Sequence, residues 1–136
     1  MKEKIISIIN QKGGVGKTTT VINLAGGLSL LGKKVLVIDL DPQGNATTGL
    51  GLSNLENSEK SIYSVLNGTK KIADVIEKTK FENLDLITPN VDLSGLEVET
   101  AGDNRRAFIL KEQIMAYLND YRGSYSHILI DCPPSL

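Results

Sequence analysis

The sequence of 136 residues has few residues of several kinds, and each shortage argues against a class of protein. The single cysteine, Cys132, cannot form an intramolecular disulfide, which agrees with a reducing compartment. With 15 basic and 16 acidic residues the net charge is −1, so no overall basic excess indicates nucleic-acid binding. No apolar run is long enough to cross a bilayer, and the first residues lead into a strand-like segment rather than a signal-peptide core. We therefore expect one compact cytoplasmic domain.

Glycine, in contrast, is concentrated in one segment near the start of the chain. Residues 10–19 are Asn-Gln-Lys-Gly-Gly-Val-Gly-Lys-Thr-Thr, and they follow a β-branched apolar run at residues 5–9. The usual phosphate-loop pattern, G-x-x-x-x-G-K-[ST], requires a glycine where this chain has Gln11. The segment also carries a second lysine, Lys12, ahead of the usual one, Lys17. The pattern predicts a variant phosphate loop.

Strand-like and helix-like segments alternate along the rest of the chain. Apolar runs predict strands over residues 5–9, 35–39, 84–87 and 128–130, and apolar spacing predicts helices over 18–31, 62–66, 72–76 and about 104–121. Residues 40–57 lack periodicity and are expected to form a loop. Gly26 and Gly27 weaken a helix, so we expect them to allow close packing on the sheet. The alternation predicts an α/β fold with a mainly parallel sheet flanked by helices.

The glycine segment has the residues that a triphosphate site needs. Gly13, Gly14 and Gly16 leave the backbone N–H groups open to phosphate oxygens. Lys17 would contact the β and γ phosphates, and the Thr18 hydroxyl is suited to a Mg2+ ligand. The alternative is a flexible glycine turn with a solvated lysine. It is disfavoured because the segment lies between a strand and a helix, as phosphate binding requires.

Three acids lie at or just beyond the ends of predicted strands, and each has an alternative interpretation. Asp131 would hold Mg2+ through a water, or it simply opens a turn. In an extended chain the side chains of Asp39 and Asp41 point to the same side, because they are two residues apart. Asp41 is the better candidate for orienting an attacking water, and the alternative is that it is an ordinary loop acid before proline. The role of Asp39 would be structural or electrostatic. Lys12 either reaches the nucleotide of another subunit or is solvated, and the sequence leaves both possibilities open.

Three segments together resemble the ParA/Soj family of partition ATPases. They are Lys-Gly-Gly-Val-Gly-Lys-Thr-Thr at residues 12–19, Asp-Leu-Asp-Pro-Gln-Gly-Asn at 39–45, and Ile-Leu-Ile-Asp-Cys-Pro-Pro-Ser-Leu at 128–136. The resemblance covers the whole chain and implies a P-loop NTPase with a variant Walker A loop. Family chains continue well beyond the last segment. We therefore expect residues 1–136 to be the N-terminal part of a single ATPase domain, truncated after the Walker B strand.

The resemblance also implies an activity, cofactors and partners. These are weak ATP hydrolysis with Mg2+, ATP-dependent homodimerisation, stimulation by a ParB-type protein, nonspecific DNA binding with nucleoid association, and chromosome or plasmid segregation. The DNA contacts belong to the continuing family chain and to no residue here. The alternatives are a nucleotide-binding or interaction fragment without turnover, and a MinD-like positioning ATPase, which would need a C-terminal amphipathic helix that this sequence lacks.

The resemblance further assigns tasks to individual residues. The residue matching Lys12 reaches across a dimer, Asp41 lies in the first switch, and residues 132–136 begin the second switch. The expected catalytic residues are Lys12, Lys17 and Asp41, and the expected metal ligands are Thr18 and Asp131. The expected nucleotide-binding residues are Lys12, Gly13, Gly14, Val15, Gly16, Lys17, Thr18 and Thr19.

Overall fold

Strands and helices alternate along the chain as an α/β fold requires. The structure is a computed structural model that describes residues 4–8, 15–41, 44–51, 60–89 and 105–132. In chain order its elements are β1 (Lys4–Ile8), α1 (Val15–Leu30), β2 (Val35–Asp39), α2 (Asn45–Gly49), α3 (Ile62–Leu66), α4 (Ile72–Val75), β3 (Glu77–Lys78), β4 (Leu84–Ile87), α6 (Arg105–Asp120) and β5 (His127–Asp131).

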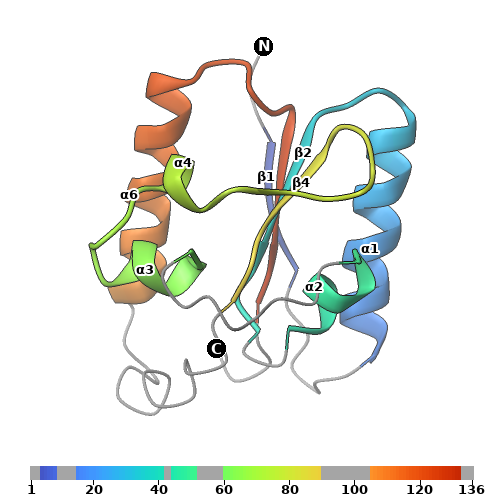
Figure 1. The fold of residues 1–136 in the computed structure, drawn as a ribbon, viewed down its shortest axis with the longest axis horizontal. Helices are drawn as coiled ribbons and strands as arrows, with labels where there is room; N and C mark the ends of the chain where they lie inside the picture. Colours follow the sequence, from blue (N-terminus) through green and yellow to red (C-terminus); the bar gives the residue numbers. More distant parts are fainter. Residues whose placement is uncertain (1–3, 9–14, 42–43, 52–59, 90–104, 133–136) are drawn as a thin grey trace.

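The strands in the described residues form one sheet in the order β1-β5-β2-β4-β3. β1, β5, β2 and β4 run parallel, whereas β3 pairs antiparallel with β4. The parallel strands end at the same edge of the sheet, toward the bottom of Figure 1. β5 lies between β1 and β2, so the acid that ends β5 has a strand end on each side.

Helices cover both faces of this sheet, with α1 and α2 on one face and α3, α4 and α6 on the other (Figure 1). Because successive side chains of a strand point to opposite faces, β2 contributes to both cores. Val35 and Val37 belong to the apolar cluster under α1, and Leu36 and Ile38 belong to the cluster under α6. Burial on both faces explains why β2 is an uninterrupted apolar run up to Asp39.

The helices and strands that are long enough to show a period lie where the sequence predicts them. The predictions for residues 35–39 and 84–87 match β2 and β4, and those for β1 and β5 differ by one residue at their ends. The helix predicted from residue 18 begins at Val15, so Gly16 and Lys17 lie in its first turn. The sequence missed β3, and the loop predicted over 40–57 is wrong for the residues that form α2.

The prediction that Gly26 and Gly27 allow close packing on the sheet is wrong. A Cβ atom added at either position meets no heavy atom within 4 Å. The close approach occurs instead at Gly49 of α2, where an added Cβ would collide with the side chain of Ile22 in α1. Gly49 of α2 therefore lies directly beside the end of the Ile22 side chain of α1.

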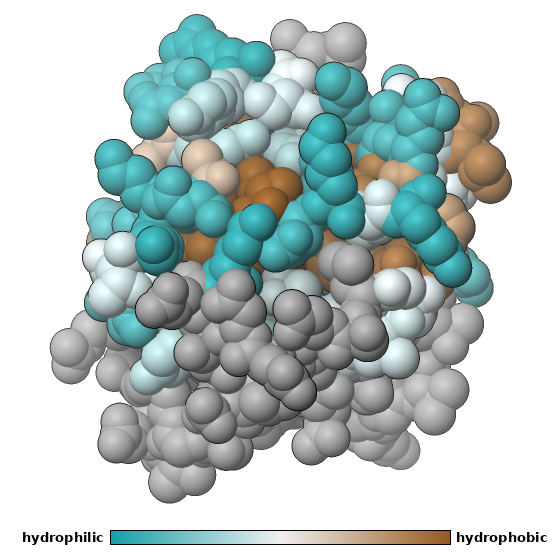
Figure 2. Space-filling model, viewed as in Figure 1, coloured by the Kyte–Doolittle hydropathy of each residue, from teal (hydrophilic) through white to brown (hydrophobic). Residues whose placement is uncertain are grey.

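Polar residues cover much of the face shown in Figure 2, and apolar side chains gather at the upper right, over the end of α1. Leu30 and Leu31 at that end are 89% and 75% exposed. Within the described ranges, no helix combines the length and the apolar character needed to span a membrane.

Candidate functional site

Two of the predicted acids meet at the edge of the sheet where the parallel strands end. Ile8 of β1 pairs with Asp131 of β5, and Asp131 also pairs with Asp39 of β2. The N–H group of Leu40 donates to the carbonyl oxygen of Asp131 at 3.0 Å, which keeps the chain beyond β2 against β5. Asp39 and Asp131 therefore occupy neighbouring positions, as the ends of adjacent parallel strands should.

The side chains of Asp39 and Asp131 are both fully buried. Burial raises the pKa of Asp39 from 3.8 to about 7, and the negative charge of Asp131 contributes to this rise. Hydrogen bonds to Asp39 from Thr47 and Asp41 act in the opposite direction, because they stabilise the charged carboxylate. Two adjacent buried carboxylates form a place where a proton or a cation is stabilised.

Asp41 lies beside this pair and is fixed through its backbone. Its N–H group donates to Oδ1 of Asp39 at 3.0 Å, and its carbonyl oxygen accepts from the N–H group of Gly44 at 2.8 Å. Gly44 has φ 66° and ψ 29°, a left-handed conformation that favours glycine, and it directly precedes α2. Asp41 itself is buried, with 8% of its surface exposed. The predicted water-orienting acid is therefore held next to the acid pair.

The second half of the glycine segment forms the first turn of α1. The backbone of residues 15–19 is helical, and the first turn contains no acidic residue. The N–H groups of a first helical turn have no partner within the helix, and the helix dipole adds a partial positive charge there. Such a turn favours phosphate. Lys12, Gly13 and Gly14 lie outside the described residues, as do the side chains of residues 15–19.

The chemistry of the donor set at this edge fits Mg2+. Asp131 offers carboxylate oxygens, whereas both oxygens of Asp39 already accept hydrogen bonds, and Mg2+ usually takes one or two carboxylates together with water and substrate phosphates. Among the residues that the structure describes, no group of three or more His, Cys, Asp or Glu side chains is placed to hold a metal.

A family match follows from comparison with known proteins. Residues 3–136 match the sequence model of a family described as an AAA domain. The chain belongs to this family. It is 45% identical over 133 residues to the chromosome partitioning protein ParA of Caulobacter vibrioides, and 46% identical over 133 residues to the sporulation initiation inhibitor protein Soj of Bacillus subtilis. The predicted resemblance to the ParA/Soj family is confirmed.

This AAA domain spans about half the length of the curated relatives it matches. Each alignment includes 98% of this chain, but only 49% of the ParA protein and 51% of the Soj protein.

Two solved structures share the fold of this AAA domain. Cobyrinic acid a,c-diamide synthase from Mycobacterium smegmatis, with bound ATP analog and magnesium, has a TM-score of 0.83 and 34% identity, covering 98% of this chain and 52% of that one. A plasmid partition protein from Borrelia burgdorferi has a TM-score of 0.77 and 34% identity, covering 98% of this chain and 57% of that one. The predicted fold class, an α/β P-loop NTPase with a mainly parallel sheet, is confirmed.

Thr47 is the residue of this AAA-domain site that the sequence did not indicate. It is fully buried in α2, and its N–H and hydroxyl groups both donate to Oδ2 of Asp39, at 3.0 and 2.7 Å. No sequence signal points to this contact, because Thr47 follows Asp39 by eight residues within the segment predicted as a loop. The second predicted switch is described only at Cys132, which is buried, and residues 133–136 lie outside the described residues.

The raised pKa of Asp39 predicts how the stability of this AAA domain changes with pH. Asp39 binds its proton more tightly in the folded chain, where its pKa is about 7, than at the ordinary value of 3.8. The stabilisation from this proton is therefore complete below pH 3.8 and is lost as the pH rises through about 7. The free energy of urea unfolding, measured without nucleotide or metal, should therefore fall in the wild type between pH 3.8 and about 7. We expect Asp39→Asn to lack the part of this fall that comes from Asp39.

Asp120→Asn, at the exposed end of α6, is the charge-matched control for this comparison. The same decline of stability with pH in the wild type and in Asp39→Asn would contradict the prediction.

Proposed function

We propose that this chain binds Mg-ATP and hydrolyses it slowly, as the nucleotide-binding part of a partition protein. The observation that supports this proposal is the fully buried pair Asp39 and Asp131 at the carboxyl edge of the sheet. Ligands of open α/β sheets bind at this edge. The ATP analog and magnesium bound to the M. smegmatis synthase, which has the same fold, agree with the proposal.

In this proposal the phosphates bind at the glycine segment and at the first turn of α1. Lys17 contacts the β and γ phosphates, and Thr18 and Asp131 hold Mg2+, Asp131 through a water. When bound, Mg2+ neutralises the charge of the phosphate oxygens. Asp41 accepts a hydrogen bond from the attacking water and orients it toward the γ phosphate. The bonds from the Asp41 backbone to Asp39 and Gly44 fix the position from which it acts.

Lys12 supports a further part of the proposal, which is an ATP-dependent homodimer. Lys17 already serves the β and γ phosphates, so a second lysine ahead of it is free to reach the nucleotide of another subunit. The similarity to a chromosome partitioning protein and to a plasmid partition protein supports segregation of chromosomes or plasmids as the process served. A ParB-type protein would stimulate hydrolysis, and the dimer would bind DNA nonspecifically. Lys70 and Lys71 are exposed surface residues and are not assigned to DNA.

Substitution of the two lysines separates nucleotide binding from dimerisation. We expect Lys17→Ala to abolish Mg-ATP binding in titration calorimetry, because it removes the charge that faces the phosphates. We expect Lys12→Ala to keep Mg-ATP binding close to that of the wild type and to lose ATP-dependent dimerisation in analytical ultracentrifugation. Lys33→Ala, just beyond α1 and exposed, is the control and should behave like the wild type. Equal affinity of the wild type and Lys17→Ala for Mg-ATP would contradict the proposal.

Hydrolysis is tested at Asp41. We expect Asp41→Asn to lower the rate of phosphate release by about 100-fold or more, because the amide cannot act as the base that orients water. Affinity for Mg-ATP should stay close to that of the wild type, since the backbone bonds of residue 41 remain. The assay measures phosphate release with and without DNA and a ParB-type protein, with Asp120→Asn as the control.

Undiminished turnover in Asp41→Asn would exclude Asp41 from hydrolysis. Mg-ATP binding by the wild type without turnover under any of these conditions would instead favour a nucleotide-binding fragment.

A further inference from the structure

A closed ring of hydrogen bonds joins α2 to the end of β2. Oδ2 of Asp39 accepts two bonds from Thr47, from the N–H group at 3.0 Å and from the hydroxyl at 2.7 Å. Oδ1 of Asp39 accepts the N–H group of Asp41 at 3.0 Å. The carbonyl oxygen of Asp41 accepts the N–H group of Gly44 at 2.8 Å, and α2 then leads back to Thr47. One carboxylate thus connects the α2 helix with the backbone of Asp41.

The helix that carries Thr47 is anchored against α1. Ala46 and Leu50, on either side of Thr47, belong to the same apolar cluster as Val21 and Ala25 of α1. Gly49 and Ile22 make the close approach described above. Thr47 is therefore held on a packed element, whereas Asp41 lies beyond the end of its strand and relies on hydrogen bonds for its position.

The hydroxyl of Thr47 makes the shortest of the three bonds to Asp39. A buried carboxylate that loses such a donor keeps the cost of its desolvation without the compensating bond. Without the hydroxyl, Oδ2 of Asp39 would keep only the bond from the Thr47 N–H group, so the carboxylate would be free to turn and its Oδ1 would no longer be fixed opposite the Asp41 N–H group. A side-chain change in α2 would in this way alter the position of the Asp41 backbone.

We propose that Thr47 is a positioning residue for hydrolysis: through Asp39, it fixes the backbone of Asp41 at the place from which its carboxylate orients the attacking water. The inference rests on the proposed hydrolysis by Asp41, and it adds Thr47 and Asp39 as the pair that holds it. Thr47 itself contacts neither nucleotide nor water in this account.

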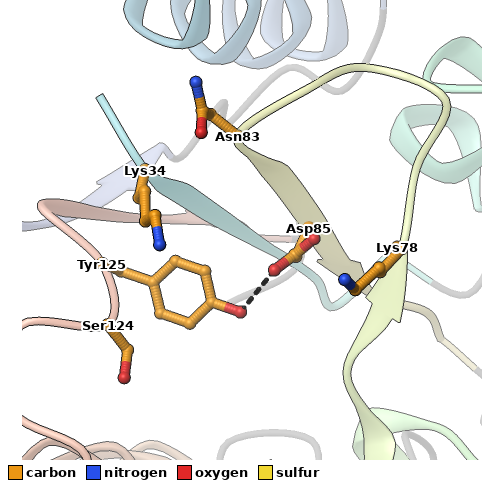
Figure 3. Close-up of a pocket in the computed structure, with 6 residues that line it drawn as sticks. All are labelled: Lys34, Lys78, Asn83, Asp85, Ser124 and Tyr125. Atoms are coloured by element: carbon orange, nitrogen blue, oxygen red, sulfur yellow. Dashed lines mark hydrogen bonds between the residues drawn. The ribbon is translucent and has the colours of Figure 1, made fainter. Parts of the chain in front are cut away.

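The test compares Thr47→Val, which has nearly the same shape but no hydroxyl, with Thr47→Ser, which keeps the hydroxyl. Thr48→Val is the matched control in the same helix, because the Thr48 side chain is exposed. Tyr125→Phe is a second control, since it removes another hydroxyl–carboxylate bond of 2.7 Å, between Tyr125 and Asp85. Figure 3 shows this pair in a pocket of about 350 Å³ also lined by Lys34 and Lys78. Lys34 and Tyr125 precede β2 and β5, so the pocket lies at the edge of the sheet opposite Asp39 and Asp131.

Two measurements are made on each variant. The first is the steady-state rate of ATP hydrolysis, separated into kcat and KM. The second is the hydrogen exchange rate of the Asp41 amide, measured by NMR without nucleotide. Each variant is compared with the wild type under conditions in which the two proteins have the same free energy of unfolding. The exchange measurement does not require turnover, so it separates failure of the Thr47 inference from failure of the proposed ATPase activity.

We expect Thr47→Val to lower kcat by about tenfold or more with little change in KM, because small misplacements of a catalytic group are costly. The Asp41 amide should exchange faster in Thr47→Val, and Thr47→Ser should restore both kcat and protection. Thr48→Val and Tyr125→Phe should leave kcat and Asp41 exchange as in the wild type. Unchanged Asp41 exchange in Thr47→Val would overturn the inference, as would an equal loss of kcat in Tyr125→Phe.

Discussion

The burial of two carboxylates side by side is the constraint on which the site depends. Asp39 and Asp131 end adjacent parallel strands and are removed from water, which costs several kcal/mol for each charge that is not compensated. Asp39 receives three hydrogen bonds, from Asp41 and from Thr47. These bonds do not fully compensate the burial of the Asp39 carboxylate, because the pKa of Asp39 still rises to about 7. A bound cation beside the pair would complete the compensation.

The fold creates this pair as a consequence of covering both faces of the sheet. Helices on both sides bury β2 and the part of β5 after His127, so these strands are apolar up to the acids Asp39 and Asp131 that end them at the edge of the sheet. The same arrangement puts α1 and α2 together on one face, where they share an apolar cluster. The helix whose first turn we propose to bind phosphate and the segment that holds Asp41 thereby belong to one packed unit, which suits the proposed coupling of binding to hydrolysis.

Apolar patterns were sufficient to predict the long elements, since β2, β4, α1 and α6 follow from runs and spacing. They were also sufficient to place Asp131 at a strand end, because the run Ile128–Leu129–Ile130 precedes it. They failed for α2 and β3, because α2 has a single apolar residue, Ala46, among Asn, Thr and Gly, and β3 consists of Glu77 and Lys78. Thr47 was missed for the same reason, and Gly26 and Gly27 were misjudged because only the packed structure shows which glycine another helix approaches.

The most direct test of the central claim is a crystal structure of this chain with Mg2+ and a non-hydrolysable ATP analogue. The account predicts that the phosphates lie against the first turn of α1 and that Mg2+ lies beside Asp131, bound directly or through a water. The bonds from Thr47 and Asp41 to Asp39 should be retained. A nucleotide bound at the opposite edge, for example in the pocket lined by Lys34 and Lys78, or a metal remote from Asp131, would contradict it.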